Sequence, residues 1–179
     1  MNEEEHYFSK LFIFCILLSM SVILIGLTLG VQNGYNCSVE EANETLNQIN
    51  QERQNITVTS IFLNNYLLTL IVFVPFIGIF WEFLLQFNTG YVLGNVAKAY
   101  NLNQFIFLSE VLSSPVGLIE YASYFLVLAE SLCLMCSLFL HEFKPRLFNH
   151  SWKTFLVVTV LLFIGAIVEC YMINGNIIF

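Results

Sequence analysis

Several kinds of residue are scarce or absent in this chain of 179 residues. There is no aspartate, so all 13 acidic residues are glutamates, and Lys and Arg together number only 6. Without aspartate the chain cannot be an intramembrane aspartyl protease or an Asp-centred hydrolase. The net charge of −7 also lacks the basic surface that nucleic-acid binding requires, which excludes a nucleic-acid partner. Charged residues make up 11% of the chain, against about a quarter in a soluble domain, and this excludes a soluble globule.

Apolar residues dominate instead, at 58% of the chain, and the mean hydropathy is +0.75. A membrane-spanning helix needs about 20 mostly apolar residues. Five stretches meet that length: Leu11–Val31, Ile61–Leu85, Gly90–Leu112, Val116–Leu140 and Thr154–Ile173. Gly90–Leu112 carries Lys98 and Glu110, so we expect it to be a broken crossing that other spans shield from lipid. The sequence therefore predicts a single all-α domain, a polytopic transmembrane helix bundle of five spans in the lipid bilayer.

The few cations predict the orientation of the bundle. Loop 32–60 contains Arg53 as its one cation, among several glutamates. Half of all Lys and Arg lie in the loop 141–153, as Lys144, Arg146 and Lys153. Cytoplasmic loops are enriched in these residues, which predicts a cell-membrane protein with the N-terminus and loop 141–153 in the cytoplasm. Loop 32–60 is then external, five crossings are needed, and a re-entrant Gly90–Leu112 would instead place the basic loop outside.

Two features of the N-terminal part refine this topology. The acidic start of the chain and the absence of a cleavage pattern predict that Leu11–Val31 is a retained anchor, not a signal peptide. In the external loop, Ser38-Val-Glu-Glu41 is a capping-box pattern, and apolar residues follow it at helical spacing. We expect a short amphipathic helix near 39–52 on the outer face.

Polar residues inside the spans are the candidates for function, because each costs free energy at bilayer depth. On a continuous second span, Asn64 and Glu82 would lie on one face, with Pro75 and Gly78 between them. Two interpretations stay open: a hydrated path for protons or cations, or polar side chains that hydrogen-bond between helices. No Lys or Arg is expected deep enough to pair with the glutamates, and Glu120 is expected to accept a hydrogen bond from the Asn64–Asn65 pair. The predicted polar framework consists of Asn64, Asn65, Glu82, Gly90, Gly94, Glu120, Glu130 and Glu169.

The first span has a face of small residues, formed by Cys15, Ser19, Gly26 and Gly30. Such a face allows close helix packing within the bundle, and the alternative is a homo-oligomer formed through the first span. Cys133-x-x-Cys136 lies inside an apolar span without accompanying ligands, so we expect no metal, cofactor or catalytic residue.

Four local patterns occur in order along the chain: Phe62-Leu-Asn-Asn65, Asn88-Thr-Gly-Tyr-Val-Leu-Gly94, Gly117-Leu-Ile-Glu120 and Gly165-Ala-Ile-Val-Glu-Cys-Tyr171. This ordered set resembles the stage II sporulation protein M family of integral membrane proteins. The chain has Val116 where the family usually has a histidine. In spore-forming bacteria the resemblance implies a membrane scaffold for peptidoglycan-degrading partners.

We therefore expect a non-enzymatic multi-pass membrane protein that acts as a scaffold or remodels the membrane, with other membrane or envelope proteins as partners. The alternative is a small transporter or permease subunit whose glutamates form ion or proton sites.

Overall fold

The computed structural model describes residues 3–53 and 56–175, and these ranges are helical almost throughout, with no strand. In chain order the elements are α1 (Glu3–Tyr35), α2 (Val39–Arg53), α3 (Val58–Val72), α4 (Ile77–Ala99), α5 (Gln104–Ser113), α6 (Pro115–Phe139), α7 (Phe143–Arg146), the π-helix η1 (Leu147–Ser151) and α8 (Trp152–Asn174). The predicted all-α bundle is confirmed.

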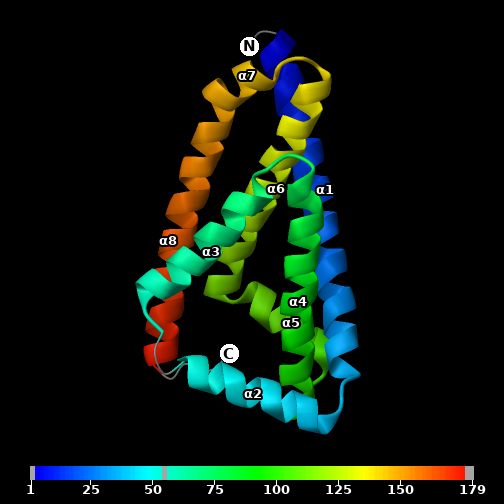
Figure 1. Ribbon diagram of the computed structural model, residues 1–179, viewed down its shortest axis with the longest axis vertical. Helices are drawn as coiled ribbons and strands as arrows, with labels where there is room; N and C mark the ends of the chain where they lie inside the picture. Colours follow the sequence, from blue (N-terminus) through cyan, green and yellow to red (C-terminus); the bar gives the residue numbers. More distant parts are fainter. Residues whose placement is uncertain (1–2, 54–55, 176–179) are drawn as a thin grey trace.

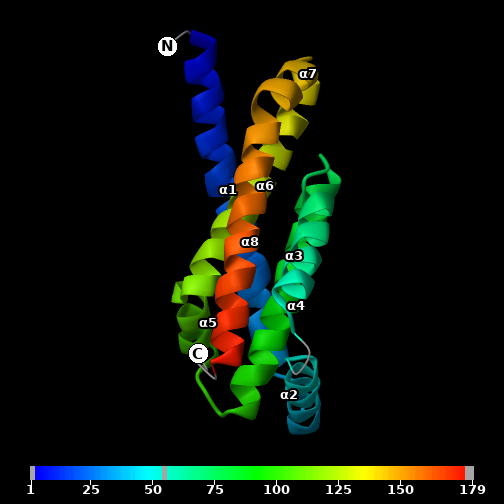
Figure 2. The same cartoon turned by 90° about the vertical axis from the view of Figure 1, so that its left-hand side faces the viewer.

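Within the described residues, three helical segments are long and apolar enough to cross a membrane, and the bent pair α2 and α3 would make a fourth if it formed one broken span. The three are Lys10–Tyr35 in α1, Pro115–Phe139 in α6, and Phe143–Asn174, which joins α7, η1 and α8. These segments run along the long axis of the molecule in alternating directions (Figures 1 and 2). Helix α2 lies across the end opposite to the start of α1, and α8 ends on the same side as α2 (Figure 1). The expected transmembrane bundle is thus present, with the start of α1 and the end of α8 at opposite ends.

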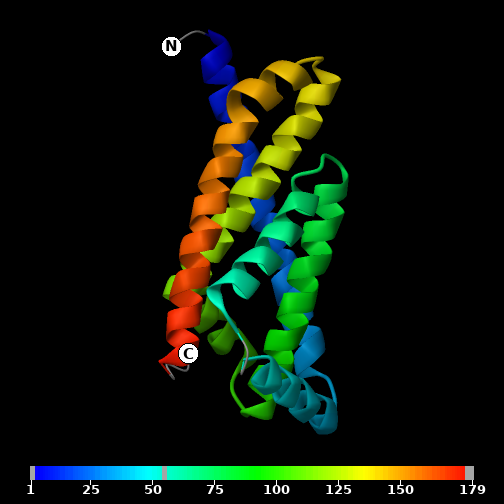
Figure 3. The same cartoon turned by 60° about the vertical axis from the view of Figure 1, so that its left-hand side comes forward.

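The predicted span Ile61–Leu85 is not a single helix. The chain leaves α3 after Val72 and begins α4 at Ile77, and it reverses direction between them, as Figures 1 and 3 show. Pro75 lacks a backbone N–H and favours an extended residue before it, so a continuous helix is disrupted there. The turn also places Phe76 at a φ of 67°, and Ser131 of α6 donates a hydrogen bond to the Val74 carbonyl at 3.2 Å. The α3–α4 hairpin therefore enters the bundle and returns to the same end.

The predicted crossing Gly90–Leu112 is also divided. Its first half belongs to α4, which ends at Ala99, and its second half is the short helix α5. Asn103 ends the turn between them and caps α5, because its side chain accepts hydrogen bonds from the Phe105 and Ile106 amides. The predicted shelter holds only in part: Asn95 is fully buried and Lys98 is half-buried, whereas Glu110 of α5 is exposed.

Close contact between α1 and α4 holds the hairpin in place. A Cβ atom on Gly30 would lie 2.1 Å from the Phe87 carbonyl oxygen, and one on Gly90 would lie 2.3 Å from that of Leu27. Only glycine permits helix backbones to approach this closely. Of the predicted small-residue face, Gly26 also packs on α4, whereas Ser19 donates a hydrogen bond to the Phe125 carbonyl of α6 at 3.1 Å. Cys15 is buried in the core, so the whole face packs within the chain.

The predicted helix near 39–52 is confirmed as α2. Its first turn is capped by Ser38, whose hydroxyl accepts a hydrogen bond from the Glu41 amide at 3.1 Å. Ala42 is fully buried, and Glu41 accepts a hydrogen bond from the Tyr91 hydroxyl of α4. Just before α2, the Cys37 thiol is hydrogen-bonded to the Asn95 side chain. Helix α2 is therefore fastened to α4 at a fixed position on the end of the bundle.

Candidate functional site: a glutamate-lined cavity

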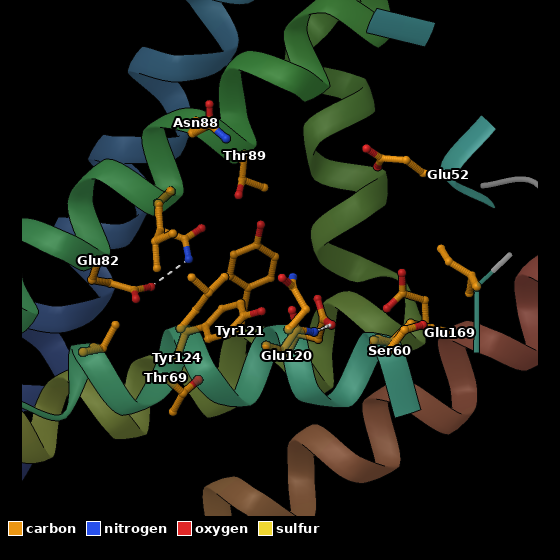
Figure 4. A pocket seen from close by; sticks show the side chains of 18 residues that line it. Glu52, Ser60, Thr69, Glu82, Asn88, Thr89, Glu120, Tyr121, Tyr124 and Glu169 are labelled. Atoms are coloured by element: carbon orange, nitrogen blue, oxygen red, sulfur yellow. Dashed lines mark hydrogen bonds between the residues drawn. The ribbon is translucent and has the colours of Figure 1, made fainter. Parts of the chain in front are cut away.

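A cavity of about 500 Å³ lies among helices α3, α4, α6 and α8. Its polar lining includes three of the glutamates that the sequence singled out, one from each of α4, α6 and α8. Figure 4 shows the side chains around it. The lining residues are Glu52, Ile56, Ser60, Ile61, Asn64, Asn65, Leu68, Thr69, Val72, Glu82, Leu85, Gln86, Asn88, Thr89, Glu120, Tyr121, Tyr124 and Glu169.

The α3–α4 hairpin creates one wall of this cavity. The prediction that Asn64 and Glu82 share a face of one helix is wrong, because the turn at Pro75 places them on different helices. Both nevertheless line the same cavity, since the hairpin folds α4 back alongside α3. The sequence thus indicated the correct residues, and the reversal of the chain brings them together.

Glu120 connects α6 to α3. Its Oε1 accepts a hydrogen bond of 2.8 Å from the Asn65 Nδ2 atom, as the sequence predicted for the Asn64–Asn65 pair. Gly165 of α8 lies opposite, where a Cβ atom would be 3.6 Å from the Glu120 Cγ atom. Glu169, one turn further along α8, lines the same cavity. Asn65, Glu120 and Glu169 of the predicted framework are thus brought together.

Glu82 forms the inner part of the lining. It is 1% exposed, and its Oε1 accepts a hydrogen bond of 2.7 Å from the Gln86 Nε2 atom, one helical turn away. The Gln86 Oε1 atom and the Thr69 hydroxyl are both buried and have no hydrogen-bond partner in the described part of the chain. Buried polar groups nearly always have hydrogen-bond partners, so these two atoms are places where a ligand could supply the missing hydrogen bonds. Periodicity did not single out Thr69 or Gln86, because only glutamates and asparagines stood out among the apolar residues.

Two tyrosines of α6 complete the inner lining. The Tyr121 and Tyr124 rings are 5.8 Å apart between centroids and meet edge to face. In the view of Figure 4 they lie between Glu82 and Glu120. The sequence did not predict their role, because tyrosine is common at membrane depth and carries no distinctive spacing.

Glu130 lies outside this cavity, in a buried ion pair. Arg146 donates from Nε to Glu130 Oε1 at 3.0 Å and from Nη2 to Oε2 at 2.8 Å. Ser151 donates to the same carboxylate at 2.7 Å, and Thr154 does so at 3.4 Å. The expectation that no cation lies deep enough to pair with a membrane glutamate is therefore wrong. Arg146 reaches Glu130 because α7 and η1 fold the basic loop back over the end of α6.

The predicted framework thus separates into three parts. Asn64, Asn65, Glu82, Glu120 and Glu169 line the cavity. Gly90 and Gly94 pack against α1, where a Cβ atom on either would lie 2.3 Å from a backbone carbonyl oxygen. Glu130 belongs to the ion pair with Arg146.

The composition of the cavity determines what it can bind. In residues 10–53 and 56–175, whose side chains the structure describes, no three His, Cys, Asp or Glu side chains are grouped so as to hold a metal ion. The lining offers carboxylates, amide oxygens, hydroxyls and aromatic rings, and no Lys or Arg. Such a lining is suited to a ligand that is positively charged and donates hydrogen bonds.

Comparison with known proteins identifies the family. No curated protein and no solved structure is significantly similar to the chain. The family model described as stage II sporulation protein M matches residues 10–172, which is nearly the whole chain. The match includes every helix that lines the cavity and both glycine faces that join α1 to α4. The chain therefore belongs to the stage II sporulation protein M family of membrane proteins.

Proposed function

We propose that this protein is a non-enzymatic membrane scaffold of the cell membrane, which holds partner proteins at one face of the bilayer. The observation that carries the proposal is the attachment of α2. This helix packs on α4 and is hydrogen-bonded to it through Glu41, and its Ala42 is fully buried, while Glu40 and Glu44 are exposed to solvent. A polar surface at a fixed position on the end of the bundle is what a docking platform requires.

The arrangement of the helices supports the proposed orientation. The start of α1 and the loop containing α7 lie at one end, and α2 lies at the other (Figure 1). Three crossings give the same sidedness as the five that the sequence predicted, because both numbers are odd. We therefore propose that segment 141–153, with exposed Lys144 in α7 and exposed Lys153 at the start of α8, faces the cytoplasm and that α2 faces outward.

Affinity purification from native membranes tests the scaffold. We expect envelope proteins to co-purify in stoichiometric amounts with the wild-type protein. They should be lost from the double variant Glu40→Lys/Glu44→Lys, whose substitutions reverse two exposed charges on α2. Glu142→Lys, at the other end of the bundle, is the matched control and should retain them. Equal recovery with all three proteins, or no stoichiometric partner at all, would contradict the proposal.

A second candidate function is a small transporter or permease subunit. The cavity favours it, because half-buried Glu169 and Glu120 and fully buried Glu82 all line it. Glu120→Gln and Glu120→Leu separate the two functions. In an ion-coupled transporter both substitutions abolish pH-dependent uptake into proteoliposomes, although Glu120→Gln leaves a folded protein. In a scaffold, Glu120→Gln retains the partners. A cytoplasmic ATPase as the stoichiometric partner would also favour the permease.

A further inference from the structure

We propose that the cavity is a binding site for a small organic polycation, with a linear polyamine as the chemical class that fits it. The site goes beyond the scaffold function and does not depend on it. Four features of the described residues lead to this ligand: carboxylates without counter-ions, buried acceptors without donors, an aromatic lining and an open mouth.

The first feature is that two carboxylates in the cavity, Glu82 and Glu120, have no positively charged partner in the described part of the chain. Glu82 and Glu120 accept hydrogen bonds from Gln86 and Asn65, and both donors are neutral amides. Among the described residues, no Lys or Arg forms an ion pair with either carboxylate. The third glutamate, Glu169, has the electrostatic attraction of Arg53, although these two described residues form no ion pair. Buried carboxylates are costly unless a positive charge or a proton compensates them. A cationic ligand would supply that charge to Glu82 and Glu120.

The second feature points to the donor groups of the ligand. The Gln86 Oε1 atom can only accept a hydrogen bond, and it has no partner although the residue is 3% exposed. Thr69 Oγ1 is likewise unpartnered, and Thr69 is 2% exposed. Both residues line the cavity. An ammonium group has N–H donors and positive charge together, whereas a phosphate or carboxylate ligand would bring only acceptors and further negative charge.

The third feature separates an organic cation from a metal ion. The glutamates come from three different helices, and the rings of Tyr121 and Tyr124 lie between Glu82 and Glu120 in Figure 4. A volume of about 500 Å³ falls within the range of small-molecule sites. Tyrosine faces attract alkylammonium groups through cation–π interactions and also pack against methylene chains. Separated carboxylates with aromatic rings between them match ammonium groups joined by a methylene chain.

The fourth feature is access. Exposed residues line the outer part of the cavity at the end of the bundle that carries α2. One of them is Glu52, whose carboxylate adds to the negative potential that attracts a cation. The exposed lining residues are Glu52, Ser60, Asn64, Asn88 and Thr89. A soluble amine can therefore reach the inner carboxylates without crossing lipid.

Spermidine binding to the full-length protein in phosphatidylcholine nanodiscs tests the site. We expect saturable binding to the wild type. Glu82→Gln and Glu120→Gln should each weaken the affinity about tenfold or more, because each removes a charged acceptor. Glu110→Gln is the matched control, since Glu110 is exposed on α5 and outside the cavity. No saturable binding, or equal affinity in all four proteins, would overturn the proposal.

Ligand variation tests the site without relying on variants that might unfold. Cadaverine should compete with spermidine, whereas the neutral diol of the same chain length should not; competition by the diol would contradict a cation site. Complete displacement of spermidine by magnesium would assign the cavity to a metal ion and overturn the proposal.

Phosphatidylethanolamine also carries an ammonium group. Unchanged spermidine affinity in nanodiscs that contain this lipid supports a soluble amine, and loss of spermidine binding would assign the cavity to a lipid headgroup instead.

Discussion

Removal of Arg146 should destabilise the bundle severely, because it would leave a buried carboxylate without its counter-ion. Glu130 and Arg146 are 1% and 4% exposed, and two hydrogen bonds of 2.8 and 3.0 Å join them. Breaking a buried pair by removing one partner costs about 3–5 kcal/mol, since the remaining charge cannot be hydrated. In Arg146→Met the hydroxyls of Ser151 and Thr154 still face Glu130, so we expect the lower part of that range, about 3 kcal/mol.

A double-mutant cycle separates the ion pair from simple packing. Glu130→Leu should cost a similar amount, since it leaves the guanidinium buried. The double variant Glu130→Leu/Arg146→Met replaces both charges with apolar groups and should cost less than either single variant. The measurement is the free energy of unfolding in mixed micelles, followed by circular dichroism. Lys144→Met removes an exposed cation from the same loop and should change that free energy by no more than about 0.5 kcal/mol.

Two results would refute this reasoning. If Arg146→Met lowers the free energy of unfolding no more than Lys144→Met does, the Glu130–Arg146 pair is not buried as its geometry indicates. If the double variant costs the sum of the single variants, the two residues stabilise the protein independently, and the coupling between them is absent.

Three further predictions concern other parts of the bundle. Cys37 should react with a membrane-impermeant thiol reagent in intact cells, whereas Lys144→Cys in a Cys37→Ser background should not; labelling of both positions would refute the proposed orientation. Burial and, next, the Glu41 carboxylate raise the pKa of the Cys37 thiol, so its labelling should keep accelerating with pH above the range where an ordinary cysteine levels off, because only the thiolate reacts. Gly90→Ala should lower the free energy of unfolding by about 1–3 kcal/mol or more, because its Cβ atom would meet the Leu27 carbonyl oxygen at 2.3 Å. Gly165→Ala, whose nearest neighbour would be 3.5 Å away, should be tolerated, and equal losses for both variants would contradict the observed packing. Asn65→Leu should destabilise the protein by about 1–3 kcal/mol in the same unfolding assay, since it leaves the Glu120 carboxylate without its amide donor; an unchanged free energy would show that this hydrogen bond contributes nothing.

Composition and periodicity predict the helices of this protein well, and they predict its turns poorly. The bilayer demands long apolar helices, so α1, α6 and α8 follow directly from hydropathy. The α3–α4 hairpin does not, because a proline within an apolar stretch is compatible either with a kink in one helix or with a reversal. Only packing against α1 and α6 decides between them, and a local pattern does not contain that information.

In the candidate site, too, the sequence identifies individual residues, whereas contacts between distant segments are visible only in the folded protein. Glu82 and Glu120 stand out in the sequence because charge is rare at bilayer depth. The hydrogen bond from Asn65 to Glu120 could be predicted, since both residues lie near the external ends of their predicted spans, Ile61–Leu85 and Val116–Leu140. Arg146 could not be paired with Glu130 from spacing, because α7 and η1 must first fold back over α6. Gln86 matters only because its carbonyl oxygen lacks a partner, and that is visible only in three dimensions.

The glycine contact between α1 and α4 also has a consequence for biosynthesis. Helix α4 carries Glu82, Gln86, Asn95 and Lys98, and it is not among the segments apolar enough to cross a membrane alone. Helix α1 precedes α4 in the chain and is apolar enough to cross a membrane alone, so it can enter the bilayer before α4 is made. Once α4 is made, the glycine face of α1 offers a surface against which α4 can pack, so that its polar residues need not face lipid. The order of the helices along the chain thus places the surface that α4 packs against ahead of α4 itself.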